Sequence, residues 1–321
     1  NRSRRYRRSP FQDHKECDSL ALLKPQEHYG FRLGDDRKLA RWPKIVEYFD
    51  HLAAGSPRIK VDHLGTTTEG RPFISAVITS EANMARLDEL HRIHCRLADP
   101  RGLSDAEASS LMAQAKAVVM ISCSIHASEV GGTQMSSELA YELVTGDDEV
   151  TRQVLDNVLF VFVPSLNPDG LEMVADYYET TLGKPWEGGP MPWLYHKYTG
   201  HDNNRDAINL SMVESQMVAR VMYGEWFPQA YIDYHHMGSY GARFYVPPFS
   251  NPVDDQVDPL RQGGRIEGPP DHHRCPVQGG VLVQPVLAPV GVGHRGGDPH
   301  DCVPQALQQL VDFLAKVPLP A

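Results

Sequence analysis

The chain has 321 residues and carries 41 Asp and Glu side chains against 31 Lys and Arg, a formal net charge of −10. That length suits one large α/β domain or two small ones. The negative charge argues against nucleic acid or an anionic membrane as the main partner. No apolar run approaches the roughly 18 residues that a membrane span needs, so we expect none. The five cysteines, odd in number and without C-x-x-C spacing, do not indicate a disulfide framework.

Helical and strand patterns alternate along the chain. The spacing of apolar residues predicts a helix over 38–53, a strand pair over 58–64 and 73–79, and helices over 84–95 and 104–116. Farther on, it predicts a strand over 117–123, a helix over 133–144, a strand over 158–163, a helix over 208–223 and a strand over 230–235. Apolar strands between amphipathic helices are typical of a sheet covered on both faces. We therefore expect an α/β fold of three layers, α/β/α, with a mostly parallel or mixed central sheet.

Two of the predicted strands end in side chains that can bind metals. His126 and Glu129 follow the strand 117–123 at H-x-x-E spacing, and the strand 230–235 ends in His235. In such folds the active crevice lies beyond the carboxyl ends of the strands. Two imidazoles and one carboxylate are a usual protein ligand set for catalytic zinc. The sequence therefore predicts one Zn²⁺ held by His126, Glu129 and His235.

Each part of this ligand set has an alternative. His126 and Glu129 could form only a polar turn and a helix N-terminus, where the helix dipole stabilises a carboxylate. His236 is a second candidate for the third ligand. Neighbours along a strand point to opposite faces, so one of the two histidines should reach the metal, and we favour His235. Asp233 shares a strand face with His235 and could orient it, although its own partner stays open.

Four blocks of the chain, taken in order, match a known family. They are residues 64–72, residues 126–129, residues 167–170, and residues 202–205 with the strand end 232–235. With these blocks the chain resembles the zinc carboxypeptidases, the carboxypeptidase A-like metallopeptidases, over roughly residues 30–250. The resemblance implies a phosphorylase/hydrolase-like fold and zinc-dependent hydrolysis of C-terminal peptide bonds, with peptide or protein C-termini as substrates. It also suggests a secreted or periplasmic location, although the basic start lacks the apolar stretch of a signal peptide.

The resemblance further implies that Asn204 and Arg205 bind the substrate. A guanidinium presents a planar fork of donors that matches a carboxylate, and a neighbouring amide adds another donor. Together they would select a free C-terminal carboxylate and confine cleavage to the last peptide bond. The alternative is a surface ion pair of Arg205 with Asp202 or Asp206. Residues 167–170, Asn-Pro-Asp-Gly, are also an ordinary turn sequence, and we expect a turn there.

Several features of the family have no match in this chain. Ser128 stands where family members often carry arginine, and no arginine lies between Asn167 and Asn204. After His235 the chain holds a single glutamate, Glu267, which comes too early to match the general base of the family. The catalytic residue is therefore unassigned, and we expect impaired activity.

Two other functions remain open. A zinc amidohydrolase that acts on N-acyl amino acids would use the same fold and the same ligands. A non-catalytic remnant that binds zinc or peptides would agree with the missing glutamate.

Composition divides the chain into three segments. We expect an N-terminal arm over residues 1–30, a zinc carboxypeptidase-like catalytic domain over 31–255, and an atypical Gly/Pro-rich tail over 256–321 with one helix at 303–316. The tail is interpreted as divergent, truncated or altered in frame, so the fold is expected to be incomplete at its C-terminus. A second metal site there is disfavoured by the irregular spacing of His272, His273, Cys275, His294, His300 and Cys302.

Overall fold

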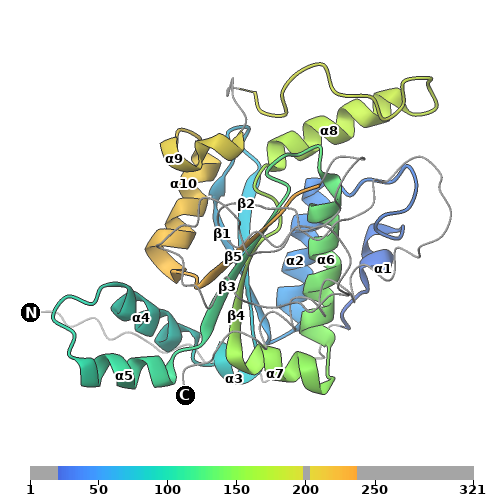
Figure 1. Cartoon of the computed structure of the whole chain (residues 1–321). Coiled ribbons are helices and arrows are strands. Elements are labelled where there is room, and N and C mark those ends of the chain that lie inside the picture. The colour runs from blue at the N-terminus through green and yellow to red at the C-terminus, as the bar shows by residue number, and fades with distance from the viewer. Residues whose placement is uncertain (1–20, 198–202, 237–321) are drawn as a thin grey trace, which may run out of the picture.

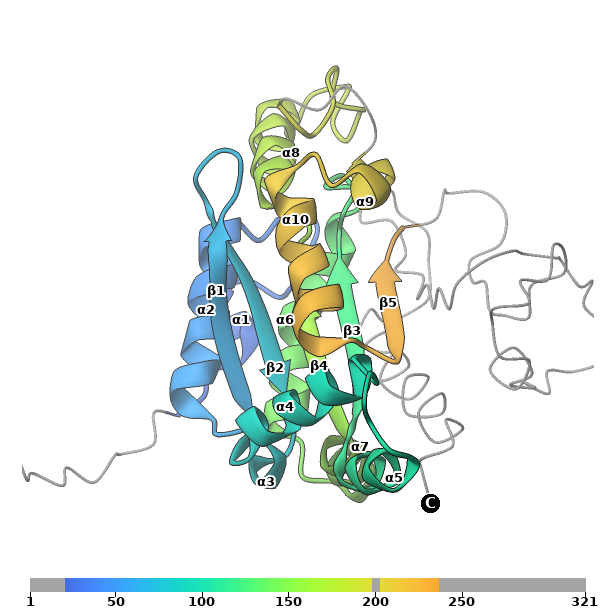
Figure 2. The ribbon, with the colours of Figure 1, turned by 90° about the vertical axis from the view of Figure 1, so that its left-hand side faces the viewer.

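One mixed sheet runs through the part of the chain that the computed structural model describes, residues 21–197 and 203–236. Its five strands are β1 (Ile59–Thr66), β2 (Pro72–Ile78), β3 (Ala117–Cys123), β4 (Val158–Val163) and β5 (Ala230–Tyr234). They lie in the order β1-β2-β4-β3-β5 (Figure 2). The predicted strand positions are confirmed to within two residues at each end, and those of β3 and β4 match at both ends.

The directions of the strands explain why the sheet is mixed. β1 and β2 form an antiparallel hairpin, and β2 pairs antiparallel with β4. β3 lies between β4 and β5 and runs parallel to both. The carboxyl ends of β3, β4 and β5 therefore meet at one edge of the sheet, where polar groups at strand ends gather.

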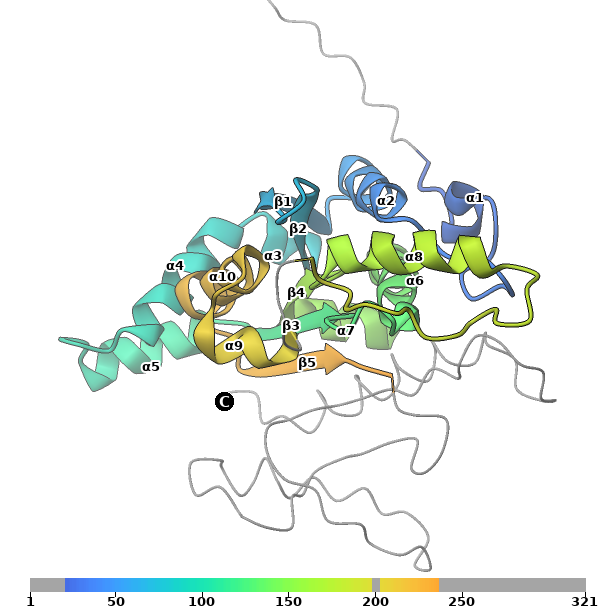
Figure 3. The same ribbon diagram turned by 90° about the horizontal axis from the view of Figure 1, so that it is seen from above.

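Helices cover both faces of this sheet, as Figures 1 and 3 show. One face packs against α2 (Trp42–Gly55), α6 (Val130–Thr145), α7 (Glu149–Asn157) and α8 (Pro168–Thr181), with the short α1 (Pro25–Tyr29) outside α2 and α6. The other face packs against α4 (Leu87–Ala98), α10 (Val213–Arg220) and the π-helical turn η2 (Val221–Trp226). Shorter elements complete the described chain: α3 (Glu81–Met84), α5 (Asp105–Gln114), η1 (Asn203–Arg205) and α9 (Asp206–Asn209).

Alternation along the strands separates two apolar cores. In β3, Val119 and Ile121 are buried with α2 and α6, whereas Val118 and Met120 are buried with α4 and η2. A strand that is apolar on both faces in this way must lie in the interior of a covered sheet. The three-layer α/β/α fold expected from the sequence is confirmed.

Two local expectations were wrong, and two helices were missed. Residues 167–170 do not form an isolated turn but the start of α8, where Asn167 is the N-cap and its side chain accepts a 2.9 Å hydrogen bond from the Gly170 N–H. The pattern of apolar residues missed α7 and α8, which were not among the predicted helices. The single helix expected over 208–223 is instead α9, α10 and η2, because Leu210 takes a left-handed conformation with φ 50° that ends α9.

Several expectations lie outside the described residues. These are Asp202, Glu267, the helix at 303–316 and the His and Cys residues of the tail. The domain limits at residues 30 and 255 stay predictions, although α1 contacts the domain through the Tyr29 hydroxyl, which lies 2.8 Å from Ser137 Oγ on α6. Among the described helices, none combines the length and the apolar character that crossing a membrane requires.

Candidate metal centre

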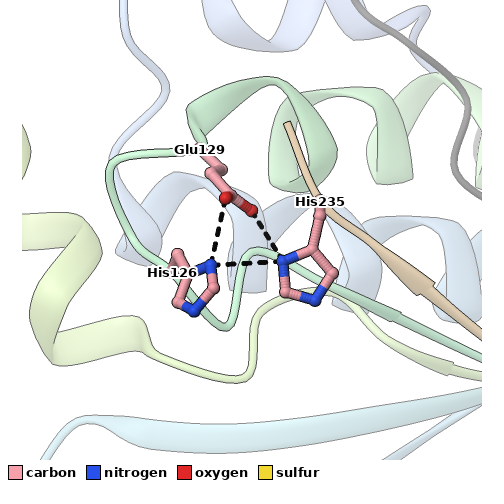
Figure 4. A group of neighbouring side chains, drawn as sticks. All are labelled: His126, Glu129 and His235. Atoms are coloured by element: carbon pink, nitrogen blue, oxygen red, sulfur yellow. Dashed lines mark hydrogen bonds and ion pairs between the residues drawn. The ribbon is translucent and has the colours of Figure 1, made fainter. Parts of the chain in front are cut away.

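The loop after β3 forms a tight turn that presents two potential ligands. Ser124 begins it in the left-handed region, with φ 49°. Its hydroxyl donates to the Glu129 carbonyl at 2.7 Å and accepts from the Thr133 N–H at 3.1 Å. The Glu129 N–H donates to the His126 carbonyl at 2.9 Å, which closes the turn. These contacts hold His126 and Glu129 with their side chains toward each other (Figure 4).

The third potential ligand comes from the neighbouring parallel strand. Cys123 of β3 pairs with Tyr234 of β5, so the two chains leave the sheet at the same level. His235 Nδ1 then lies 3.2 Å from His126 Nδ1 and 3.0 Å from Glu129 Oε2, while His126 Nδ1 lies 3.0 Å from Glu129 Oε1 (Figure 4). Two side chains of one turn and a third that is more than a hundred residues away in the sequence thus point their donor atoms at one place.

The spacing of these donor atoms suits zinc. Zn–N bonds of about 2.0–2.1 Å at tetrahedral angles separate ligand atoms by about 3.3 Å. The three donor atoms all lie within 4.8 Å of one another. Among the described residues this is the one group of three His, Cys, Asp or Glu side chains with such spacing. Two imidazole nitrogens and one carboxylate oxygen are also the donor chemistry that zinc prefers.

The two neighbouring histidines at the end of β5 face different partners. His235 Nε2 lies 2.8 Å from Asp233 Oδ2, which leaves Nδ1 directed at the other two side chains. His236 instead accepts a hydrogen bond from the Gly131 N–H at 3.0 Å through Nε2. Alternation along the strand therefore brings His235, and not His236, to His126 and Glu129.

Hydrogen bonds within the cluster shift the pKa values of Glu129 and His235 in opposite directions. Burial alone would raise the pKa of Glu129, but hydrogen bonds with His126 and His235 outweigh it and lower this pKa to about 2. Burial alone would lower the pKa of His235, but hydrogen bonds with Asp233 and Glu129 outweigh it and raise this pKa to about 10. The surroundings thus favour a charged carboxylate and a positive charge beside it. A metal cation would take the place of the imidazole proton.

The segment expected to bind substrate is anchored beside this cluster. In η1, the buried Asn203 donates from Nδ2 to the Ile125 carbonyl at 2.6 Å, directly before His126. Asn204 is half-buried and Arg205 is exposed. Asn203 was not predicted to have a separate role, and its place inside the block 202–205 was the signal that could have indicated one.

One of the two alternative partners of Arg205 is Asp206, which accepts hydrogen bonds from the segment that follows it. Asp206 is fully buried, and its two carboxylate oxygens accept hydrogen bonds from the Ser211 and Met212 N–H groups at 3.1 and 2.9 Å. These bonds tie α9 to the start of α10. Recognition of a substrate by Asn204 and Arg205 stays a prediction.

The sequence of this chain matches a known protein family. The family model described as zinc carboxypeptidase matches residues 45–276, which is more than half of the chain. The match begins later than the resemblance read from the sequence and runs further. A search of curated proteins gave no significant match.

Solved structures support the same fold. A metallo-carboxypeptidase from Pseudomonas aeruginosa, in complex with (2-guanidinoethylmercapto)succinic acid, has a TM-score of 0.54 at 13% identity, over 87% of this chain and 70% of that chain. The carboxypeptidase A from Helicoverpa armigera has a TM-score of 0.50 at 14% identity, over 92% and 76%.

A metallo-carboxypeptidase from Burkholderia cenocepacia is 18% identical with a TM-score of 0.41, and the match covers 62% of this chain and 42% of that chain. This chain therefore spans about two fifths of that relative. At such identities the structural likeness shows the fold alone, whereas the family model matches the sequence directly. The chain belongs to the zinc carboxypeptidase family.

Proposed function

We propose that this protein binds one Zn²⁺ through His126, Glu129 and His235 and hydrolyses the C-terminal peptide bond of peptides or proteins. The observation that carries the proposal is the convergence of three donor atoms within 4.8 Å beyond the carboxyl ends of two parallel strands. The side chains of His126, Glu129 and His235 are 19%, 16% and 10% exposed, so a ligand can reach them from solvent.

The residues around the site have separate tasks in this proposal. Zinc, when bound, supplies Lewis-acid activation of water and of the scissile carbonyl. Glu129 contributes a negative charge that holds a cation, and the His126 and His235 rings present Nδ1 toward the same point. Asn204 and Arg205 offer an amide and a guanidinium for the terminal carboxylate of the substrate.

Recognition of a carboxylate has support from a relative. The Pseudomonas aeruginosa metallo-carboxypeptidase was solved with a succinic acid derivative, which carries two carboxylic acid groups. In the chain described here, η1 is joined to the metal loop by the contact of Asn203 with the Ile125 carbonyl. A terminal carboxylate bound at Arg205 would therefore lie beside the proposed zinc ligands. Exopeptidase action follows from that arrangement.

One observation favours a second candidate function. Residues 236–321 contain a single glutamate, Glu267, so the general base of the family has no evident match in this stretch of sequence. A protein that binds zinc and peptide C-termini with weak or no turnover is the corresponding alternative. An amidohydrolase that cleaves N-acyl amino acids is the other.

The test measures zinc content and turnover on the same purified sample. Three substrates separate the candidates: a peptide with a free C-terminus, its C-terminally amidated twin, and an N-acyl amino acid. Release of the last residue from the free peptide alone supports a carboxypeptidase, and cleavage of the N-acyl amino acid alone supports an amidohydrolase. Stoichiometric zinc and binding of the free peptide without turnover support the non-catalytic candidate. A sample that acquires no zinc on reconstitution refutes the metal site.

The family also suggests a secreted or periplasmic location, which we retain as a proposal. Fractionation of the native source would test it, since recovery of the protein only with cytosolic markers would exclude it.

A further inference from the structure

A buried carboxylate lies directly behind the third proposed ligand. Asp233 is on β5, two residues before His235, and is 5% exposed. Its Oδ2 lies 2.8 Å from His235 Nε2. A charged group inside a sheet is costly unless every lone pair that faces the interior has a partner. The second oxygen of Asp233 therefore needs a partner too.

That partner is supplied by the neighbouring strand. Ser122 of β3 is paired with Asp233 in the parallel register and is fully buried. Its hydroxyl donates to Asp233 Oδ1 at 2.7 Å. The Tyr231 hydroxyl also lies 2.7 Å from Ser122 Oγ. A serine has one O–H to donate, and it is directed at Asp233, so Tyr231 must donate to Ser122.

The resulting hydrogen bonds have a fixed direction. Tyr231 donates to Ser122, Ser122 donates to Asp233 Oδ1, and Asp233 Oδ2 is the acceptor that faces His235. His235 must then carry a hydrogen on Nε2, the atom that faces Asp233. The lone pair of the neutral imidazole is thereby placed on Nδ1, the atom that lies 3.0 Å from Glu129 Oε2. This is the tautomer that a metal at the cluster requires.

We propose that Asp233 is a positioning residue, which with Ser122 and Tyr231 fixes the tautomer and the ring orientation of His235 for metal binding. The proposal deepens the zinc site proposed above and rests on it for the metal, but the hydrogen on Nε2 can be observed without metal. Carboxylates that accept from a ligand histidine typically change metal affinity about 10- to 100-fold when they are removed.

The experiment compares zinc affinity in the full chain and in three variants, by competition with a chromophoric chelator. Asp233→Ala should raise the zinc Kd about 10- to 100-fold. Asp233→Asn should lose less, because its amide oxygen can still accept from His235 while its NH₂ donates to Ser122. Asp206→Ala is the matched control. It also removes a fully buried, hydrogen-bonded carboxylate, one that joins α9 to α10, and it should leave the zinc Kd within about threefold of the parent.

A second readout is independent of the metal. Long-range ¹H–¹⁵N spectra of the metal-free protein with labelled histidine report which ring nitrogen is protonated, and loss of a signal in His235→Gln assigns it. The parent and Asp233→Asn should show a slowly exchanging Nε2–H signal, which marks the hydrogen that faces residue 233, and Asp233→Ala should lose this signal. Tyr231→Phe, which removes only the donor to Ser122, should shift the Nε2–H resonance without abolishing it.

The outcomes separate this inference from the zinc proposal. If the parent binds no zinc while the spectra change as expected, the metal site fails and the positioning of His235 stands as a structural property. If the parent binds zinc and Asp233→Ala binds it equally well with an unchanged Nε2–H signal, the inference is wrong and the zinc site stands. Equal losses in Asp206→Ala and Asp233→Ala would assign the effect to stability and also refute the inference.

Discussion

At the scale of single residues, His235 and His236 can be compared for their effect on zinc binding. Both are imidazoles at the end of one strand, yet one faces Glu129 and the other accepts from the Gly131 N–H. We predict that His235→Ala loses bound zinc, because two protein ligands rarely retain it, whereas His236→Ala retains at least half. Zinc per chain after dialysis against a weak chelator measures both. Zinc retained in His235→Ala and lost in His236→Ala would reverse the assignment.

Arg205 is the residue that we propose binds the terminal carboxylate of the substrate. If it reads a terminal carboxylate, a peptide with a free C-terminus should bind at least tenfold more tightly than its amidated twin, because charge-assisted hydrogen bonds contribute about 1.5–3 kcal/mol each. Arg205→Lys should reduce this ratio, since an ammonium lacks the planar bidentate contact. Isothermal titration with both peptides gives the ratio directly. Equal affinities in the parent would favour a surface ion pair for Arg205.

The residues of the site differ in how well the sequence predicts them. His126, Glu129 and His235 are predictable because each follows an apolar strand, and parallel strands bring their carboxyl ends together. The contact of Ser122 with Asp233 is not predictable in this way, because 111 residues separate the two and the pairing of β3 with β5 must be known first. Local spacing predicts the candidate ligands, whereas the contacts behind them depend on the order of the strands.

At the scale of elements, the backbone at the start of α8 packs closely against the loop that contains Tyr195. A Cβ added at Gly170 would lie 2.3 Å from the Tyr195 carbonyl oxygen and 2.5 Å from Asn167 Nδ2. We predict that Gly170→Ala destabilises the protein by about 1–3 kcal/mol, because a backbone oxygen must move to make room. The midpoint of urea denaturation measures it.

The control for that substitution is Gly224→Ala in η2. Its nearest neighbour would be the flexible Arg220 Cγ at 3.7 Å, an ordinary contact. Alanine there should be neutral or should stabilise by up to about 1 kcal/mol, since glycine is unfavourable within a helix. Equal effects of the two substitutions would contradict the crowding argument at α8.

Elements with strong apolar patterns were predicted best. β3 and β4 are buried along almost their whole length, and polar or turn residues flank them: Lys116 and Ser124 at β3, Asn157 and Pro164 at β4. α8 was not predicted because Asn-Pro-Asp-Gly reads as a turn, although Asn at the N-cap followed by Pro at the first helical position also starts helices. α7 carried a signal as well, since Asp148 caps it through hydrogen bonds to the Val150 and Thr151 N–H groups. Turn and helix-start sequences share the same residues, so local spacing alone could not separate them.

At the scale of the whole molecule, Glu142 on α6 links stability to pH. Burial, followed by the charge of Glu138, raises its pKa from the ordinary 4.5 to about 7. The folded state therefore binds more protons than the unfolded state between these two pH values, and the free energy of unfolding should fall as pH rises through this window.

Glu142→Gln removes the titrating group, so its stability should fall less steeply between pH 4.5 and 7 than that of the parent. Glu149→Gln, which changes a carboxylate that is 84% exposed, serves as the control and should keep the parent slope. Thermal midpoints at four pH values would show the difference. A Glu142→Gln variant with the slope of the parent would contradict the role of Glu142.

Peptidase turnover depends on a general base as well as on the proposed metal ligands. General acid–base catalysis contributes about 10²- to 10⁴-fold, so a chain without a matching base should be at least that much slower than an intact family member. We therefore predict zinc binding with weak or no peptidase activity for residues 1–321. The assay uses a free and an amidated peptide, with Glu267→Gln beside the parent. Robust activity that disappears in Glu267→Gln would make Glu267 the base and overturn the prediction.

The turn that begins at Ser124 has a consequence for the order in which the site assembles. Its hydrogen bonds join residues no more than nine positions apart, so closing it costs little chain entropy and needs few distant contacts. His235 lies 109 residues from His126 and arrives only when β5 has docked on β3. We therefore expect the turn with His126 and Glu129 to form early, through local contacts. His235 should reach it later, through the long-range pairing of β5 with β3. During synthesis, the two proposed ligands of this turn would therefore be in place before the third.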